Sequence, residues 1–233
     1  RDLSDGKAER ERASKERRAA HISSKLSNPD YSILNDIATD ITLKARNGEL
    51  MEVVGRDDEI RKVEIALTRR DKNNVVLLGD GGVGKSAIVD GIAMRIARDE
   101  VLSLKGKRIL QFSLNDLNAT IGGFSSEGIN RFIEEMKREK DVVLFVDEIH
   151  MLGRAKHLTD LFKPLMARGD FRIIGATTPM EWNAYVASDT AFVRRFEKVI
   201  VEEPSIEDAV KIVETIAPAY ENFHHANFED DTI

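Results

Sequence analysis

The sequence predicts an α/β protein built on a parallel β-sheet that is sandwiched by helices. Short apolar runs of strand length alternate with segments whose apolar residues recur every three or four positions. A glycine-rich turn directly follows one of these runs, as it does where a strand leads into a helix. With 233 residues, of which 42% are hydrophobic, the chain is long enough for one sizeable core, or for one core and a small appendage.

The expected elements follow one another in a regular order. Helical spacing begins at Tyr31, with Gly48 placed to close that helix, and a second helix follows Gly55. Further helices are expected around 88–96, 129–136, 158–166 and 205–216, and strands at 75–78, 108–112, 142–146, 171–174 and 199–201. Because the strands alternate with helices, we expect parallel strands covered on both faces.

The amino-acid composition excludes several classes of function and of binding site. No apolar run approaches the roughly 18 to 20 residues needed to span a bilayer, so no membrane partner is expected. The chain has no Cys, which excludes disulfides and thiolate metal sites and is compatible with a cytoplasmic location, the one we expect. The formal net charge of -6 argues against a general basic surface for nucleic acid.

Residues 1–30 form a charged amino-terminal segment. Acids and bases alternate in it, as in Glu9-Arg10-Glu11-Arg12, and large apolar side chains are few. Such a segment has little to bury, so we expect a solvated helix or a linker supported by pairs such as Glu11 with Lys15. An arm that binds nucleic acid is the alternative.

The strongest motif is a glycine-rich loop, Gly79-Asp80-Gly81-Gly82-Val83-Gly84-Lys85-Ser86, which fits the pattern G-x-x-x-x-G-K-[ST]. It follows a buried strand and opens a helix, the context in which backbone N–H groups converge on phosphate oxygens. An ordinary glycine-rich turn is the alternative. The ATP-binding residues predicted here are Gly79, Gly81, Gly82, Val83, Gly84, Lys85, Ser86 and Ala87, with Lys85 against the β and γ phosphates and the Ser86 hydroxyl on Mg²⁺.

Polar side chains follow the next two central strands. Asp147 and Glu148 end the apolar run at 142–146, at the sheet edge where open parallel sheets bind ligands. We expect Asp147 to hold the Mg²⁺ water shell and Glu148 to orient and polarise the attacking water. Thr177 and Thr178 would present a hydroxyl beside Glu148, although a Thr before Pro179 also fits a helix cap.

Arg194 and Arg195 precede the last strand. In a monomer this pair would be surface charge. If a neighbouring subunit packs its phosphate site against this edge, the pair instead supplies positive charge to the transition state of phosphoryl transfer. The second interpretation requires a ring of subunits, and the residues alone leave both open.

Taken together, these residues resemble a known family. Over about residues 35–233 the chain resembles the first AAA+ module of the Clp-type unfoldases and disaggregases, such as ClpB, ClpA and ClpC, which have a P-loop NTPase fold. The matching stretches are 53–60, Lys72-Asn73-Asn74, the phosphate loop, 144–150, 163–169, Gly175-Ala176-Thr177-Thr178, Arg194-Arg195-Phe196 and Glu203-Pro204-Ser205.

The resemblance implies roles for further residues. Val53 and Val54 would flank adenine, and Thr178 would be the first sensor of the γ phosphate. The catalytic set would then be Glu148, Thr178, Arg194 and Arg195, the two arginines reaching into the next subunit.

The resemblance also implies a domain organisation and a pore. Residues 31–203 would form the large α/β nucleotide-binding subdomain, and 204–233 the beginning of a small helical lid that is truncated here. Phe124 would grip substrate in a pore loop, although the stretch Gly123-Phe124-Ser125-Ser126 lacks the family's flanking cations and Phe124 could instead be tucked into the sheet.

The leading hypothesis is a motor module that binds ATP and Mg²⁺, hydrolyses ATP, and unfolds or remodels proteins. By resemblance it would work in a homo-hexameric ring that threads a protein substrate through its pore, with an adaptor or a protease as further partner. Two alternatives belong to other classes: a nucleic-acid-directed AAA+ ATPase of the loader type, and an ATP-gated assembly module of a secretion or conjugation machine.

Overall fold

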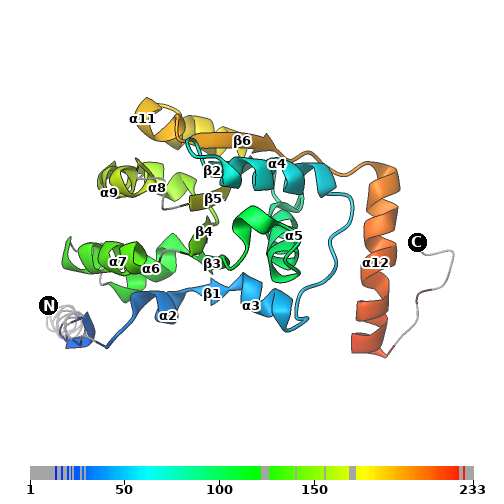
Figure 1. The fold of residues 1–233 in the computed structure, drawn as a ribbon, viewed down its shortest axis with the longest axis horizontal. Coiled ribbons are helices and arrows are strands. Elements are labelled where there is room, and N and C mark those ends of the chain that lie inside the picture. The colour runs from blue at the N-terminus through cyan, green and yellow to red at the C-terminus, as the bar shows by residue number, and fades with distance from the viewer. Residues whose placement is uncertain are drawn as a thin grey trace, which may run out of the picture. The chain divides into compact units, whose positions relative to one another are not determined.

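A computed structural model of the chain describes residues 14, 17, 20, 22, 24–26, 28, 30–121, 126–139, 141–154, 156–167, 172–225 and 228. In these residues strands and helices alternate, as Figure 1 shows, which confirms the predicted α/β class. No helix among them is both long and apolar enough to cross a bilayer.

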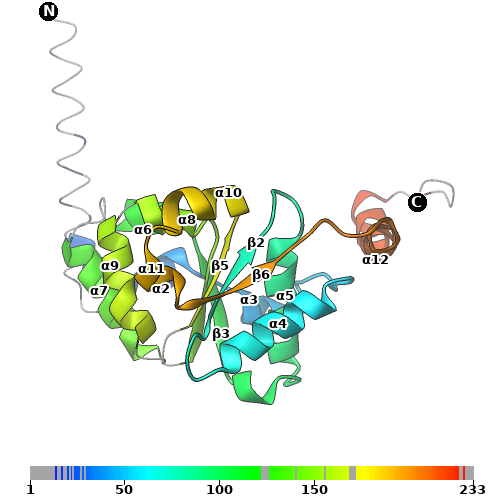
Figure 2. The same ribbon diagram turned by 90° about the horizontal axis from the view of Figure 1, so that it is seen from above.

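The sheet has six strands: β1 (Thr39–Asp40), β2 (Asn74–Leu78), β3 (Arg108–Phe112), β4 (Val142–Val146), β5 (Arg172–Thr177) and β6 (Phe196–Ile200). Their spatial order is β1-β3-β4-β5-β2-β6. The pairs β4 with β5, β5 with β2, and β2 with β6 are parallel, and Figure 2 shows β2, β5 and β6 side by side. Every residue of β2 and β4 is buried, which explains why both segments are apolar almost without interruption.

By its contacts the chain divides into two compact units. The first comprises residues 1–39 and 112–140 and contains α2 (Ile33–Ile37), α6 (Leu114–Thr120) and α7 (Ser126–Arg138). The carboxylate of Glu135 on α7 accepts hydrogen bonds from the Ser32 hydroxyl and, at 2.9 Å, from the Ile33 N–H group. Glu135 therefore satisfies donors at the start of α2 that the helix itself cannot satisfy.

The second unit, residues 40–111 and 141–233, holds most of the sheet and its core. Its helices are α3 (Ile41–Arg46), α4 (Asp57–Thr68), α5 (Lys85–Ala97), η1 (Leu102–Leu104), α8 (His150–Arg154), α9 (Lys156–Ala167), α10 (Pro179–Glu181), the π-helix η2 (Trp182–Val186), α11 (Thr190–Val193) and α12 (Ile206–His224). Figure 2 shows α4 and α5 on one side of the strands and α9 and α11 on the other, which is the predicted sandwich.

Two helices differ from the sequence expectation. The single helix expected from Tyr31 to Gly48 is wrong, because the chain is extended at Ala38 and α3 starts anew after Asp40, whose carboxylate caps it by accepting from the Leu43 N–H group at 2.8 Å. The helix expected to end near 216 continues as α12 to His224. Pro218 lies inside α12 but is exposed, so water can reach the carbonyl group that Pro218 leaves without a donor.

Candidate functional site

The carboxyl ends of three neighbouring strands meet at one edge of the sheet. In the parallel register Leu78 of β2 lies beside Thr177 of β5, and Val146 of β4 lies beside Gly175. The Gly79 N–H group continues the ladder by donating to the Thr177 carbonyl oxygen at 3.2 Å. The phosphate loop, the Asp147-Glu148 pair and the two threonines therefore leave the sheet at the same edge.

The loop after β2 has the backbone that the phosphate-loop motif predicts. Gly82 and Gly84 have φ of 83° and 96°, a region that other residues adopt only with strain. Gly84 is the N-cap of α5, and no side chain caps that helix, so the N–H groups of its first turn point out of its end without a side-chain acceptor. The Lys85 ammonium group lies over the loop and donates to the carbonyl oxygens of Gly79 at 2.8 Å and Asp80 at 2.7 Å.

Gly79 is required by packing rather than by its dihedral angles. A Cβ atom at this position would lie 2.4 Å from the Val201 carbonyl oxygen and 2.8 Å from a methyl group of Val83. Any larger residue would push the loop away from the segment that follows β6. Gly81, in contrast, has open space around it, as has the Gly82 position.

The two acids after β4 are exposed at this edge. The Asp147 carboxylate accepts from the Glu148 N–H group at 2.9 Å, and Glu148 has a φ of 51°. A left-handed conformation is costly for a residue with a Cβ atom, so the surrounding structure must hold Glu148 in it. Among the described residues, no side chain bonds to the Glu148 carboxylate, which leaves it able to bind water.

The threonine pair after β5 has two different environments. Thr177 is buried, and its hydroxyl group lies 2.9 Å from His150 Nδ1 and 3.1 Å from the Glu181 carboxylate. Thr178 is the N-cap of α10 in a capping box with Glu181, whose N–H group donates to the Thr178 hydroxyl at 3.2 Å. The helix-cap alternative therefore describes Thr178, while its hydroxyl still lies at the same sheet edge as Glu148.

A pocket of about 370 Å³ adjoins the phosphate loop. It is lined by Met51, Glu52, Val53, Val54, Arg56, Gly82, Val83, Gly84, Ala87, Asp90, Pro204, Ala209, Ile212, Val213 and Ile216. The pocket joins the segment before α4, the loop, α5 and α12 around a mostly apolar space, which suits a flat heterocyclic base. It thus brings Val53 and Val54 together with Gly82, Val83, Gly84 and Ala87 from the predicted ATP-binding set.

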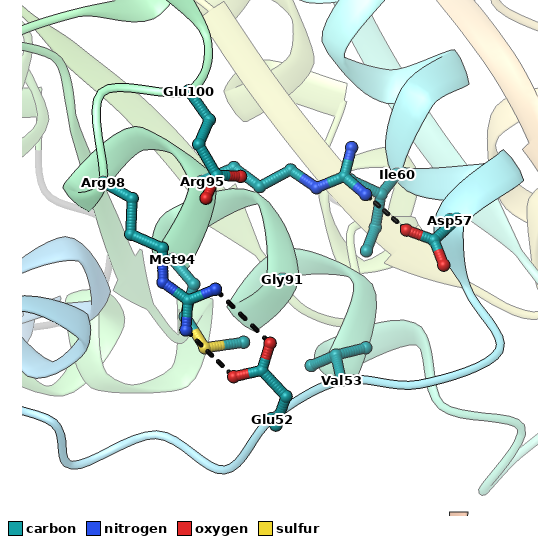
Figure 3. A pocket seen from close by; sticks show the side chains of 9 residues that line it. All are labelled: Glu52, Val53, Asp57, Ile60, Gly91, Met94, Arg95, Arg98 and Glu100. Atoms are coloured by element: carbon teal, nitrogen blue, oxygen red, sulfur yellow. Dashed lines mark hydrogen bonds and ion pairs between the residues drawn. The ribbon is translucent and has the colours of Figure 1, made fainter. Parts of the chain in front are cut away.

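Figure 3 shows how the segment that carries Val53 is held against α5. The Arg98 guanidinium makes two hydrogen bonds to the Glu52 carboxylate, at 2.9 Å and 3.3 Å. Gly91 faces Val53, and a Cβ atom on Gly91 would lie 3.6 Å from the Val53 Cβ and 2.5 Å from Ile60 Cδ1. The missing side chain of Gly91 lets Ile60 of α4 pack closely against α5, with Val53 at ordinary contact distance.

Charged residues of the pocket that were not predicted from the sequence include Arg56 and Asp90. Arg56 is only 6% exposed, and its guanidinium donates to the Val83 carbonyl oxygen at 2.6 Å and to Glu59 at 3.0 Å. Asp90 lies one helical turn after Ala87 on the same face of α5, and burial raises the pKa of its carboxyl group. The i, i+3 spacing from Ala87 was the available signal for Asp90, whereas nothing in the sequence marks Arg56 as buried.

Apolar residues of α12 were also missed. The four residues that line the pocket from α12 recur at helical spacing: Ala209, Ile212, Val213 and Ile216. The pattern predicts the helix, but only its placement in the fold shows which pocket its apolar residues line.

Other predicted site residues are not brought to this edge. Arg194 and Arg195 come directly before β6, whose first residue Phe196 lies beside Asn74, whereas the phosphate loop follows the other end of β2. Along a strand this separation is about 13 Å for four residues. Arg194 is exposed, and Arg195 donates to the Ala191 carbonyl oxygen. Phe124 lies outside the described residues.

Known proteins share both the sequence and the fold. The chain is 40% identical over 214 residues to the chaperone protein ClpB of Corynebacterium diphtheriae, with 87% of this chain and 25% of that protein covered. It is 42% identical over 210 residues to ClpE of Bacillus subtilis, an ATP-binding subunit of an ATP-dependent Clp protease, with 86% and 30% covered. The chain therefore spans about a quarter to a third of the length of these relatives.

A solved structure agrees with the sequence relatives. A closed-state cryo-EM reconstruction of Hsp104 with ATPyS and FITC casein matches with a TM-score of 0.78 and 37% identity, covering 86% of this chain and 36% of that one. These likenesses confirm the predicted resemblance to the Clp-type proteins and the predicted fold. Residues 75–203, more than half of the chain, match the model of the ATPase family associated with various cellular activities (AAA), and the chain belongs to that family.

Proposed function

We propose that this chain is the ATP-hydrolysing module of a ring-forming motor that unfolds or remodels proteins. The observation that carries the proposal is the meeting of the phosphate loop, Glu148 and Thr178 at the carboxyl ends of β2, β4 and β5. A phosphoryl group held by the loop would have a carboxylate and a hydroxyl group beside it, the arrangement that hydrolysis by an activated water needs.

Each residue of the site has a separate task in this proposal. The loop N–H groups and Lys85 bind the phosphates, and the apolar pocket beside Val53 and Val54 takes the base. Glu148, strained and without a side-chain partner among the described residues, orients and polarises the attacking water. The Thr178 hydroxyl positions that water by accepting a hydrogen bond from it, since its own proton is donated to Glu181.

The oxygen ligands at the site suit a hard cation. The Ser86 hydroxyl and the Asp147 carboxylate would hold Mg²⁺, Asp147 through water, because magnesium prefers oxygen donors and keeps several of its waters. The ion would supply positive charge that stabilises the phosphates during transfer.

The place of the arginine pair favours action between subunits. Arg194 and Arg195 lie at the sheet edge opposite their own phosphate loop, so they can supply charge to a phosphate only in a neighbouring subunit. In the proposal they do so within a homo-hexamer, and Phe124 grips the threaded protein in the pore. An adaptor or a protease would be a further partner, and the cytoplasm the location.

The relatives support this hypothesis over the two alternatives. Their names describe chaperones and a protease subunit, and one solved relative was captured with casein, a protein. A loader that acts on nucleic acid and an assembly module of a secretion or conjugation machine receive no comparable support.

ATP turnover and nucleotide binding by the protein at its full natural length test the proposal. We expect Glu148→Gln to bind ATP as the wild type does but to hydrolyse none, and Lys85→Ala to lose nucleotide binding itself. A wild type that binds ATP without hydrolysing it, or a Glu148→Gln variant with wild-type turnover, would contradict the proposed chemistry. An ATPase that never unfolds a tagged model protein would leave the hydrolysis intact and remove the motor.

A further inference from the structure

A hydrogen-bonded chain of three side chains links the start of α8 with the ends of β5 and α10. His150 and Thr177 are buried, and His150 Nδ1 lies 2.9 Å from the Thr177 hydroxyl oxygen. That hydroxyl lies 3.1 Å from Glu181 Oε2, and His150 Nδ1 is 3.4 Å from the same oxygen. Each member comes from a different element, and the bond between His150 and Thr177 joins residues 27 positions apart in the sequence.

The chemistry of the three groups determines which group donates and which accepts in each hydrogen bond. The hydrogen bond from the Thr178 hydroxyl, helped by the other donors around it, holds the pKa of Glu181 below its usual value, so this carboxylate only accepts at neutral pH. The single Thr177 proton therefore goes to Glu181, and the Thr177 oxygen accepts from His150. His150 must then carry its proton on Nδ1.

The His150 ring is also held by packing. Its centroid lies 5.8 Å from that of Tyr185, and the Arg154 guanidinium covers the Tyr185 ring at 4.4 Å while donating to its hydroxyl at 3.0 Å. The π-helix that carries Tyr185 approaches α8 so closely that a Cβ atom on Gly153 would lie 2.2 Å from the Tyr185 carbonyl oxygen. The ring orientation is therefore set from two sides.

At one end, the chain reaches the sensor threonine. Glu181 Oε2, which accepts from Thr177, also accepts from the Thr178 hydroxyl at 2.8 Å and from the Thr178 N–H group at 3.3 Å. Moving the Glu181 carboxylate would therefore move the Thr178 hydroxyl with it.

At the other end, the chain lies close in the sequence to the acid proposed to activate water. His150 follows Glu148 by two residues, and the Ile149 N–H group between them donates to the Ala176 carbonyl oxygen at 3.1 Å. Glu148 has a left-handed φ of 51°, and the hydrogen bond of Ile149 fixes the backbone directly after it. His150 is the first side chain after Glu148 that is anchored by a hydrogen bond to β5.

We propose that His150, Thr177 and Glu181 are positioning residues that hold the Glu148 carboxylate and the Thr178 hydroxyl in the geometry for hydrolysis. The inference rests on the proposed function, since it assigns these residues to the same reaction. They act through Glu148 and Thr178 and touch neither the phosphate nor the water. Small displacements of reacting groups can lower a rate on the order of a hundredfold, so loss of the chain is expected to lower kcat.

Thr177→Val tests the central link because it replaces the hydroxyl by a methyl group of the same size. We expect kcat for ATP hydrolysis to fall about tenfold or more, while the Kd values for ADP and for ATP stay within about twofold of the wild type. Thr177→Ser keeps the hydroxyl and is expected to retain most of the turnover. His150→Phe should behave like Thr177→Val, and His150→Asn, whose amide nitrogen can replace Nδ1, should recover part of the loss.

The sequence provides its own control for folding. Trp182 is its only Trp, follows Glu181 directly and is buried, so its emission maximum reports whether this segment keeps its packing. Equal kcat in Thr177→Val and wild type would overturn the positioning role. A fall in kcat accompanied by a shifted Trp182 emission and an equal rise in Kd would show a merely structural contribution, which also overturns it.

The outcomes separate this inference from the proposed function. The proposed function fails if the wild type does not hydrolyse ATP, or if Glu148→Gln hydrolyses it as fast as the wild type does. The positioning role then fails as well. If the wild type hydrolyses ATP and Glu148→Gln does not, but the His150 and Thr177 variants keep wild-type kcat, only the positioning role is wrong. The Nδ1–H tautomer of His150, read from its ¹H–¹⁵N spectrum, tests the hydrogen-bond direction in either case.

Discussion

The Asn74 carboxamide donates to the backbone carbonyl oxygen of Arg195 at 3.3 Å. Its oxygen accepts from the Ile173 N–H group at 2.9 Å, and Asn74 is 1% exposed. One buried amide at the start of β2 thus holds both neighbouring strands, and it fixes the backbone of an arginine proposed to act between subunits.

Replacing Asn74 with Ala would leave a buried N–H group and a carbonyl oxygen without partners. We expect the free energy of unfolding to fall by about 1–3 kcal/mol, measured by urea unfolding. Asn74→Asp, which keeps the acceptor for Ile173 but cannot donate to Arg195, separates the two bonds. A loss below about 0.5 kcal/mol for Asn74→Ala, the size expected of an exposed substitution, would contradict the importance of this amide.

Mixed oligomers test whether the arginine pair acts between subunits. Arg194→Ala/Arg195→Ala subunits keep their own phosphate loop, and Lys85→Ala subunits keep their arginines, so each variant should be inactive alone. Because the pair lies at the edge opposite its own loop, we expect mixing the two to restore part of the ATPase activity.

Glu148→Gln mixed with Lys85→Ala is the matched control. Both defects then lie in the nucleotide site, and no arrangement of neighbours repairs it. Mixed oligomers of the arginine and lysine variants that stay as inactive as this control would show that the arginines do not complement a neighbour's site.

Arg56 connects the segment before α4 to the phosphate loop. Its guanidinium holds the Val83 carbonyl oxygen and the Glu59 carboxylate, which is itself largely buried. Arg56→Ala leaves both acceptors unpaired, so we expect the nucleotide Kd, measured by calorimetry, to rise on the order of tenfold. Glu59→Gln removes only the ion pair and should change the Kd far less; an equal effect of both would mean that the contact with Val83 is unimportant.

The buried carboxyl group of Asp90 should make the free energy of unfolding depend on pH. Burial raises the pKa of its carboxyl group, and the charge of Lys44 opposes this only in part. The folded state therefore holds the proton more tightly than the unfolded state, in which the pKa is about 4, so stability falls as the pH rises from there through the folded-state pKa. Above the folded-state pKa the full penalty of the buried charge is present.

Asp90→Asn removes that charge, so we expect a higher Tm at pH 7 and a gain that shrinks as the pH is lowered towards about 3. Asp71→Asn, at an exposed carboxylate, serves as control and should change Tm little at either pH. Thermal unfolding followed by circular dichroism measures both. An equal gain for Asp90→Asn at pH 7 and pH 3 would mean that its charge is not the cause.

The strand and loop signals were predictable because they are local. The runs at 108–112 and 142–146 are strands with these bounds, and the turn from β2 into α5 has the glycine conformations that its motif requires. Where the local pattern was compatible with either one helix or two, contacts with residues distant in the sequence determined which of them formed. The apolar spacing between Tyr31 and Gly48 fits one helix, yet a new helix starts after Asp40, which caps it. The Thr42 hydroxyl in this second helix accepts a hydrogen bond from the Ile109 N–H group, 67 positions away.

The domain bounds at 30/31 and 203/204 and the roles of the individual site residues stay predictions. The sequence alone determined the α/β class, the phosphate loop and the acids after β4, since hydrophobic period, glycine spacing and strand ends are properties of short segments. Only the tertiary structure decided that Arg56, Asp90 and α12 enclose the pocket beside the phosphate loop, and that Thr177 points to His150. Those contacts are made between residues far apart in the chain. Packing in three dimensions brings them together, and no local sequence pattern encodes that packing.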